Sequence, residues 1–306
     1  RGAVIAQRRR RLEVDGATFG GGRIVLPYYG ARDFEKLAEA GANLVVMSFP
    51  ELWTVARPWR RDAQASDMLG EQLDAAKAAG LFVVLGLRSG PGRSDFIFHR
   101  DSAGDWFPPE LIVDSIWRDE EAQDAWSAMC VDAARMIAGR AETAGLILMV
   151  EPEPNAFGLD HDGRTLGAWE PEAYARRVGR VSDWRAMAGR CARAVRTASK
   201  ALPVLISPPA FARPDFLPVM GEPPVPGTVW CVHDYEPRRF THRPRDSAGL
   251  IPFQERAGAF DSRMKAAQGQ GAPVFLGEFG AARWNQDAPA YHAARAAACE
   301  RLGINW

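Results

Sequence analysis

Two glutamates in this 306-residue sequence stand at the ends of short apolar runs. Glu151 follows the run at residues 145–150, and Glu278 follows the run at residues 273–277. Such runs are typical of buried strands, and an acid at the tip of a strand is held rigidly beside a cleft. Two carboxylates that face each other can act as general acid and nucleophile on a glycosidic bond. A single strand-end glutamate more often caps a helix or pairs with a basic residue, so the prediction depends on the pair.

The elements that would position these acids alternate along the chain. A β-hairpin is expected at residues 12–19, and apolar runs predict strands at residues 23–28, 41–47, 81–87, 146–150, 203–207, 228–233 and 273–278, with an eighth beginning at 303–306. Helical patterns lie between most of them, at residues 33–40, 66–79, 120–144, 184–201, 253–268 and 289–302.

This alternation predicts an α/β fold with a parallel sheet covered by helices. Eight units favour a closed (β/α)8 TIM barrel over an open sheet, and no glycine-rich phosphate fingerprint follows the first strand. We expect a single domain over residues 1–306. The eighth unit is short, so we expect it to be truncated at the C-terminus.

The balanced charge of the chain argues against two classes of partner. The formal net charge is +0, which argues against nucleic acid or an anionic membrane as a partner, and the basic stretch at residues 8–11 reads as a solvated edge. No segment is apolar enough to span a membrane. We expect a monomer, with a secreted or periplasmic location slightly favoured over a cytoplasmic one. The widely spaced cysteines suggest buried free thiols rather than a zinc site: Cys130, Cys191, Cys231 and Cys299.

The carboxyl ends of the predicted strands carry polar, titratable and aromatic residues. In a barrel of this kind the working face is formed by those ends. Carboxylates there could do the bond chemistry, His and Tyr could orient them, and Trp could offer a flat apolar face to a sugar ring. The strand-end set comprises Ser48, Arg88, Glu151, Ser207, His233, Tyr235, Glu278 and Trp284.

Several motifs, in order along nearly the whole chain, resemble glycoside hydrolase family 5, the cellulase-type barrels of the retaining clan A. They are VDGATF at residues 14–19, GANLVV at 41–46, GLFVVLGL at 80–87, LMVEP at 148–152, VHDYEP at 232–237 and LGEFG at 276–280. The resemblance implies a retaining hydrolase of β-linked glycans or glycosides, with an oligo- or polysaccharide substrate and no cofactor or metal.

Site roles follow from the same resemblance. Glu278 would be the nucleophile, and a fourth-strand glutamate would be the acid/base. Glu151 is preferred for that role, with Glu153 as the alternative. His233 and Tyr235 would border the nucleophile, with Tyr235 donating a hydrogen bond to it. The remaining residues expected to bind substrate are Arg88, Asn155 and Trp284.

The chain departs from the family pattern at several strand ends. Val150 stands where the family usually has an Asn that binds the sugar, and Asn155 could substitute from the loop. Val46 stands where an Arg often lies beside the nucleophile. The third strand ends in Arg88 instead of His, and Arg88 could supply the missing positive charge. The aromatic residue that commonly floors the cleft would lie at or beyond Trp306.

Other readings of the sequence stay open. The departures also fit a carbohydrate-binding barrel with impaired catalysis. A lyase or aldolase is disfavoured because no lysine stands at a strand end, and residues 160–162 are a poor metal site because consecutive ligands rarely converge. The aromatic residues after the second and third strands could wall subsites or pack locally: Trp53, Trp59, Phe96, Phe98, His99, Trp106 and Phe107.

Overall fold

The computed structural model describes residues 1–6, 12–19, 22–26, 29–104, 107–154, 170–175, 179–242 and 252–306. Four of the segments discussed above lie outside the described residues. They are the basic stretch at 8–11, Trp106, Asn155 and the stretch at 160–162.

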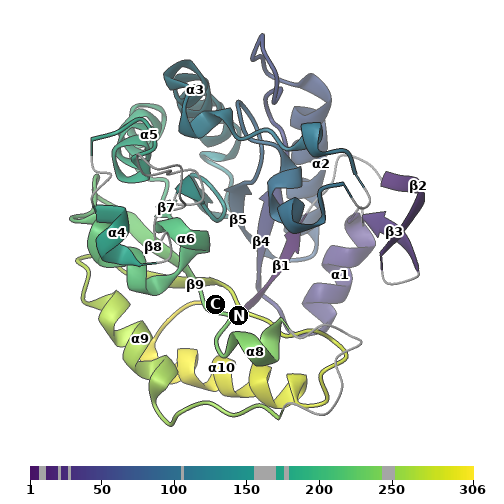
Figure 1. The fold of residues 1–306 in the computed structure, drawn as a ribbon, viewed down its shortest axis with the longest axis vertical. Coiled ribbons are helices and arrows are strands. Elements are labelled where there is room, and N and C mark those ends of the chain that lie inside the picture. The colour runs from purple at the N-terminus through teal and green to yellow at the C-terminus, as the bar shows by residue number, and fades with distance from the viewer. Residues whose placement is uncertain are drawn as a thin grey trace.

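Parallel strands form the centre of the molecule, and helices surround them (Figure 1). Seven strands pair in the order β1-β4-β5-β6-β7-β8-β9, which makes a nearly closed barrel. Their bounds are β1 Gly2–Ala6, β4 Leu44–Phe49, β5 Phe82–Leu87, β6 Thr143–Ile147, β7 Val204–Ile206, β8 Thr228–His233 and β9 Val274–Glu278. Beyond β9, Asn305 forms a parallel bridge with Phe275 at the eighth position. The predicted α/β barrel is confirmed.

The helices largely follow the predicted alternation. The longer ones are α1 Ala31–Glu39, α2 Ala63–Ala78, α3 Glu120–Ile137, α5 Trp184–Ala198, α9 Ala259–Gln268 and α10 Ala288–Leu302. Shorter ones are α4 Pro171–Ala175, α6 Pro209–Ala212, α7 Leu217–Met220 and α8 Arg238–Thr241. Turns of 3₁₀ helix cover Asp95–Ser102, Pro109–Leu111, Ser115–Trp117 and Pro214–Phe216. No helix in the described ranges is long and apolar enough to cross a membrane.

The first barrel strand was predicted in the wrong place. The hairpin expected within residues 12–19 is instead a single strand, β2 (Leu12–Phe19). The run expected at residues 23–28 is β3 (Gly22–Leu26), which pairs antiparallel with β2 in a separate two-stranded sheet. The barrel begins instead with β1, whose residues pair in parallel with β4. Both segments are short apolar runs, and periodicity alone does not determine which partner such a run will find.

Two helix ends differ from their predicted positions because of nearby glycines. Helix α3 ends at Ile137 instead of continuing to 144, because Gly139 follows with a positive φ of 83° and β6 starts at Thr143. Helix α9 begins at Ala259 instead of 253, after Gly258 in the left-handed region. Glycine adopts that backbone conformation at little cost and commonly marks helix boundaries.

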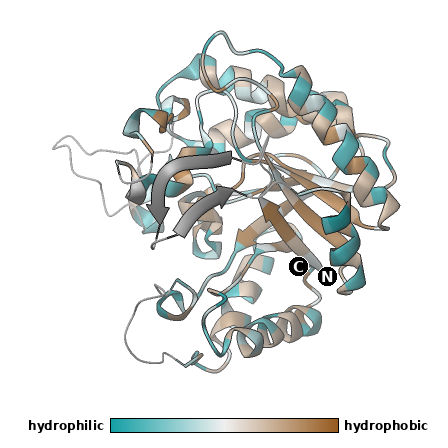
Figure 2. Ribbon diagram, turned by 90° about the vertical axis from the view of Figure 1, so that its right-hand side faces the viewer, coloured by the Kyte–Doolittle hydropathy of each residue, from teal (hydrophilic) through white to brown (hydrophobic). Residues whose placement is uncertain are grey.

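The barrel interior is filled by a small apolar cluster, distinct from the larger core between strands and helices. Its buried members are Val46, Val84, Ile147, Val150, Leu205, Cys231 and Phe275. Figure 2 shows hydrophobic colouring on the barrel strands and a mixture of hydrophilic and hydrophobic colouring on the surrounding helices. Because side chains alternate along a strand, Ser48, Arg88, Ser207 and His233 share the inward parity of this cluster and lie above it, at the carboxyl ends.

Candidate active site

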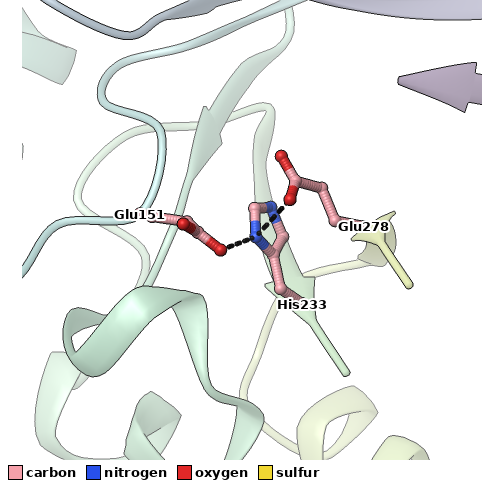
Figure 3. Close-up of side chains that lie close together, drawn as sticks. All are labelled: Glu151, His233 and Glu278. Carbon is pink, nitrogen blue, oxygen red and sulfur yellow. Dashed lines mark hydrogen bonds and ion pairs between the residues drawn. The ribbon is translucent and has the colours of Figure 1, made fainter. Parts of the chain in front are cut away.

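Three titratable side chains converge at the carboxyl ends of β6, β8 and β9. Nδ1 of His233 lies 2.8 Å from Oε1 of Glu151 and 3.5 Å from Oε2 of Glu278 (Figure 3). One ligand-type atom from each of the three residues lies within 4.8 Å of the other two. The strand-end glutamates that stand 127 positions apart in the sequence therefore meet at one site.

Glu151 is held in an uncommon backbone conformation just beyond β6. Its φ is +49°, in the left-handed region that non-glycine residues rarely adopt. Neighbouring side chains hold the segment in place, because Trp126 Nε1 donates to the Leu148 carbonyl at 3.0 Å and Arg93 Nη2 donates to the Glu151 carbonyl at 2.9 Å. Strained backbone of this kind persists where surrounding contacts over-determine it, and it is common at functional sites.

His233 occupies a space that a glycine on the next strand leaves open. A Cβ on Gly277 would lie 3.0 Å from Nε2 of His233 and 2.6 Å from Sγ of Cys231. Any larger residue at Gly277 would therefore displace the histidine. The His233 side chain is only 2% exposed, so its protonation is controlled by its protein neighbours.

The electrostatics of these groups are coupled. Burial alone would lower the pKa of His233, but the carboxylates of Glu278 and Glu151, together with a contact from Cys231, raise it well above the ordinary value. Burial raises the pKa of Glu278, and Glu151 adds to this, whereas His233, Tyr235 and Arg88 act in the opposite direction. Burial, and then the charge of Glu278, raise the pKa of Tyr235, which keeps its hydroxyl protonated.

Tyr235 and Arg88 flank Glu278 from two other positions. The Tyr235 hydroxyl donates to Oε2 of Glu278 at 2.9 Å. Arg88 pairs through Nε with Oδ1 of Asp95 at 2.6 Å, and its guanidinium lies 4.2 Å from the centre of the Phe98 ring. Glu278, Tyr235 and Arg88 line a cavity of about 740 Å³ that extends between β1 and α10.

Glu153 lies in different surroundings from Glu151. Its Oε2 accepts a hydrogen bond from Arg93 Nη2 at 2.6 Å, and Trp117 Nε1 lies 3.4 Å from its Oε1. The side chains of Glu153 and Arg93 are 3% and 0% exposed. Arg93 Nη1 also donates to the Arg88 carbonyl at 2.6 Å. The structure thus distinguishes the surroundings of Glu151 from those of Glu153, which their shared strand parity in the sequence did not.

Not every predicted site residue reaches this group. Trp284 is 47% exposed in the loop after β9 and is absent from the described lining of the cavity that Glu278 shares. Asn155 lies outside the described residues. Substrate binding by these two residues stays a prediction. Ser48 and Ser207 are buried, and within the described ranges their hydroxyls have no hydrogen-bond partner.

Several aromatic residues in the loops after β4 and β5 have local packing partners. Phe96 stacks with Phe107 at 4.8 Å between ring centres, and Phe98 supports Arg88 and Arg93. Trp53 packs against the main core and donates to Asp132 at 3.0 Å. Trp59 lines a separate surface pocket beside Arg57.

Sequence reasoning missed Asp95 as the partner of Arg88. The signal in the sequence was Asp95 itself, an acidic residue seven positions after Arg88 and at the start of a 3₁₀ helix.

Glu151, His233 and Glu278 also form a set of atoms that could bind a cation. Carboxylate and imidazole donors suit zinc, which takes three protein ligands in catalytic sites. In this structure the same atoms already pair with one another, with His233 Nδ1 shared between the two carboxylates. Their arrangement is therefore accounted for by charge pairing and hydrogen bonding among the three side chains.

The fold and the site together define a parallel α/β barrel with two acids meeting above its strand ends, the architecture of barrel glycosidases. The sequence profile of Cellulase (glycosyl hydrolase family 5) matches residues 27–306. The chain therefore belongs to glycosyl hydrolase family 5 and is a glycoside hydrolase by membership. The predicted family is confirmed, and its members act on carbohydrate substrates.

Solved structures show the same fold at low sequence identity. Cel5A, an endoglucanase from Thermotoga maritima, is 15% identical, with a TM-score of 0.65 over 92% of this chain and 82% of its own. The cellulose synthase subunit Z of Clostridioides difficile is 14% identical, with a TM-score of 0.69 over 100% of this chain and 89% of its own. No curated protein sequence gives a significant match.

Proposed function

We propose that this protein hydrolyses β-linked glycans or glycosides with retention of anomeric configuration, with Glu278 as nucleophile and Glu151 as acid/base. The observation that carries the proposal is the closeness of the two acids, whose nearest oxygens lie within 4.8 Å. Retaining glycosidases hold their carboxyl groups about 5–5.5 Å apart, whereas inverting enzymes leave about 6.5–9.5 Å for a water. The short separation supports direct attack by one carboxylate.

The proposed reaction has two steps. In the first, an oxygen of Glu278 attacks the anomeric carbon, the glycosidic C–O bond breaks, and Glu151 gives its proton to the leaving oxygen. In the second, Glu151 takes a proton from water, the hydroxide attacks the anomeric carbon, and the bond to Glu278 breaks. The proton that is given up in the first step is thus restored in the second.

His233 and Tyr235 support these roles through their contacts. The raised pKa of His233 favours its protonated form, in which Nδ1 donates to Glu151. The proton of this pair is then available to the leaving oxygen through Glu151. Tyr235 holds Oε2 of Glu278 through its hydroxyl, which fixes the carboxylate for attack and favours its ionised form.

Arg88 is better suited to stabilising charge than to binding sugar. Its guanidinium is fixed by Asp95 and by the Phe98 ring, it lines the same cavity as Glu278, and its charge lowers the pKa of that carboxyl. We assign it to keeping Glu278 ionised in a partly buried site. This assignment fits the absence of an arginine at Val46 on the preceding barrel strand.

Glu153 is the weaker candidate for the acid/base. Its carboxylate is paired with the fully buried guanidinium of Arg93, which does not deprotonate in proteins and so exchanges no protons with it. Its 3% exposure also leaves no room for a leaving group to approach. Glu151 is 16% exposed and contacts a histidine that can exchange protons.

The substrate class rests on the family and on its structural neighbours. Proteins of similar fold are described as endoglucanases, and Cel5A has been solved with cellobiose and with mannotriose. β-1,4-Glucan and mannan oligosaccharides are therefore the first substrates to screen, alongside aryl β-glycosides. The proposed mechanism requires no metal, so activity should persist after treatment with a chelator.

The decisive experiment combines product stereochemistry with a variant. Proton NMR of the first product should show the β-anomer, and Glu278→Ala should reduce turnover by about 10⁴-fold or more while the circular dichroism spectrum stays unchanged. Glu71→Gln, at an exposed position on α2, is the matched control and should keep full activity. An α-anomeric first product, or near-normal turnover in Glu278→Ala, would refute the mechanism.

The rival reading, a carbohydrate-binding barrel without catalysis, gives a different result in the same screen. It requires measurable glycan binding by the wild-type protein with no turnover of any aryl glycoside or oligosaccharide. The observation that supports this alternative is Val150, which stands in place of the family's usual sugar-binding Asn.

A further inference from the structure

The side chain of Glu278 points into the site against the alternation of its own strand. On β9, Leu276 packs in the larger core outside the barrel, and Phe275 lies in the barrel interior. Because successive side chains of a strand point to opposite faces, Gly277 should face inward and Glu278 outward. The Glu278 carboxylate nevertheless lies 3.5 Å from Nδ1 of His233, inside the site.

An extra residue in β9 explains this change of direction. Val232 and His233 are consecutive on β8. Their partners on β9 are Leu276 and Glu278, so Gly277 stands between them as the extra residue of a bulge. A β-bulge changes the direction of a side chain and is common beside active sites. The bulge therefore turns Glu278 towards His233.

One backbone hydrogen bond continues the pairing of β8 with β9 beyond the bulge. The N–H of Asp234 donates to the Glu278 carbonyl at 3.0 Å. Tyr235, the next residue, donates to the carboxylate of the same glutamate at 2.9 Å. The position of this short segment of β8 thus determines where both the backbone and the carboxylate of Glu278 are held.

The side chain of Asp234 binds on the side away from the site, towards α9 and α10, which lie beside β9 (Figure 1). Its Oδ2 accepts from Arg263 Nε at 2.6 Å. Glu255 accepts from Arg263 Nη2 at 2.9 Å and from Arg295 Nη1 at 2.6 Å. The side chains of Asp234 and Arg295 are 1% and 2% exposed, with 3.9 Å between Oδ1 and Nη2. We call this balanced group the outer ion cluster: Asp234, Glu255, Arg263 and Arg295.

Helix α10 also binds the backbone of residues 234–236. Arg295 Nη2 donates to the Glu236 carbonyl at 2.6 Å, and the Tyr291 hydroxyl donates to the Asp234 carbonyl at 3.2 Å. Burial raises the pKa of Tyr291 to about 12, so its hydroxyl stays protonated as a donor. This segment is therefore held by side chains that lie outside the site.

We propose that the outer ion cluster is a positioning device, which holds the bulge of β9 and thereby keeps the Glu278 carboxylate aimed into the site. It touches no substrate and acts through the backbone of Asp234. The inference rests on the proposed function, in which Glu278 is the nucleophile. Buried ion pairs add little net stability compared with apolar residues, but they can fix one arrangement of the chain.

Asp234→Asn tests this role. The amide keeps the size of the side chain but removes the charge that binds Arg263. With an aryl β-glycoside, kcat should fall by about 10–100-fold, because a displacement of about 1 Å in a reacting group can cost about 10²-fold. KM should stay within about twofold of the wild type, since the change acts on the reacting group.

The titration of Glu278 gives a second measurement that needs no turnover. Carbon-13 NMR of protein labelled at the glutamate carboxyl carbons follows it, and Glu278→Gln assigns the signal. Burial and the charge of Glu151 raise the pKa of this carboxyl, and three neighbours lower it: His233, Tyr235 and Arg88. A carboxylate released from the hydrogen bond of Tyr235 should titrate at higher pH, so Asp234→Asn should move the signal in that direction.

Asp261→Asn is the matched control. Asp261 on α9 pairs with Arg301 on α10 at 2.8 Å, so the control breaks an ion pair between the same two helices but outside the outer ion cluster. It should keep the wild-type kcat and the wild-type titration of Glu278. If Asp234→Asn does not fold, Arg263→Gln replaces it, because that side chain is 27% exposed and its loss removes the same hydrogen bonds.

Circular dichroism establishes that each variant is folded at the temperature of the assay. A folded variant of the outer ion cluster with wild-type kcat and an unmoved titration would overturn the proposal, even with a lower Tm, because the cluster would then serve stability alone. An equal loss of kcat in Asp261→Asn would also overturn it. A wild-type protein without turnover would refute the proposed function instead, and the titration of Glu278 would still decide whether the cluster holds this carboxylate.

Discussion

Glu151 and Glu153 stand two positions apart on one segment, and their surroundings differ completely. Glu153 is 3% exposed and is bound to Arg93, whose side chain is fully buried. Glu151 is 16% exposed and contacts His233, which in turn lies near Glu278. One acid faces a permanent cation, and the other faces a group that can gain or lose a proton.

This difference shows how one segment can carry both a structural and a chemical carboxylate. Arginine stays charged at any accessible pH, so Arg93 gives Glu153 a fixed partner that exchanges no protons with it. Histidine titrates within the working range of most enzymes. In the proposed mechanism, proton transfer is therefore assigned to Glu151, and anchoring of the loop is assigned to Glu153.

Within the comparison of Glu151 with Glu153, the largest effect should come from Glu151→Gln. An amide keeps the shape of the side chain but cannot donate an acidic proton to a leaving oxygen, so kcat/KM on an oligosaccharide should fall by about 10²–10⁴-fold. Aryl glycosides with acidic phenol leaving groups need less protonation of the leaving oxygen, so Glu151→Gln should slow their cleavage less. Steady-state kinetics on both substrate types measure the contrast, and the Tm should stay within about 2 °C of the wild type.

The contrast between Glu151 and Glu153 is wrong if Glu153, and not Glu151, transfers the proton. If Glu151→Gln keeps the wild-type rate on an oligosaccharide while Glu153→Gln loses it with an unchanged Tm, Glu153 is the acid/base. Equal losses on aryl glycosides and oligosaccharides in Glu151→Gln would point to a binding defect instead of lost proton donation.

Glu153→Gln should mainly affect stability. It would leave the Arg93 guanidinium buried without its counter-ion, and breaking a buried pair in this way costs about 3–5 kcal/mol. Urea unfolding at neutral pH gives the free energy directly. The double variant Arg93→Met with Glu153→Leu removes both charges and should recover part of the loss. A Glu153→Gln protein of wild-type stability would show that the pair is not the anchor of this loop.

The sequence predicted the meeting of Glu151, His233 and Glu278 because each follows or ends an apolar run. Parallel strands with their carboxyl ends at one face leave little freedom in where such residues lie. The same reasoning placed the first barrel strand at residues 23–28 and did not include the similar short run at 2–6, because the choice of strand partner is decided by tertiary contacts.

The pairing of Arg93 with Glu153 could not be predicted either. These residues are 60 positions apart, and both belong to loops whose backbone path has no periodic signal. The left-handed φ of Glu151, which turns the chain between the two acids, is likewise imposed by packing around it. Loop conformation was thus the missing information, and it is what separates Glu151 from Glu153.

A smaller effect is expected when the support of Glu278 is weakened. Tyr235→Phe removes a hydrogen bond to a charged group, which is worth about 1.5–3 kcal/mol, so kcat should fall by about 10–100-fold. Because that bond lowers the pKa of Glu278, the acid limb of the kcat/KM profile should move to higher pH. Arg88→Gln should shift the limb in the same direction. A lower rate with an unmoved limb would mean that Tyr235 contributes only packing.

The smallest effect concerns the dependence of stability on pH, in which Glu278 and Glu153 should differ. Burial raises the pKa of Glu278, so the folded state binds more protons than the unfolded state above the ordinary carboxyl pKa. Stability should therefore fall as pH rises through the folded pKa.

The raised pKa of His233 has the same sign and acts above its ordinary value of 6.5. Glu278→Gln removes the first contribution and, by removing a negative neighbour, reduces the second. It should flatten the dependence of Tm on pH. Glu153→Gln should leave that slope unchanged while lowering stability throughout. Thermal scans from pH 5 to pH 9 compare the two variants, and an equally steep slope in Glu278→Gln would show that the stability cost of this site lies elsewhere.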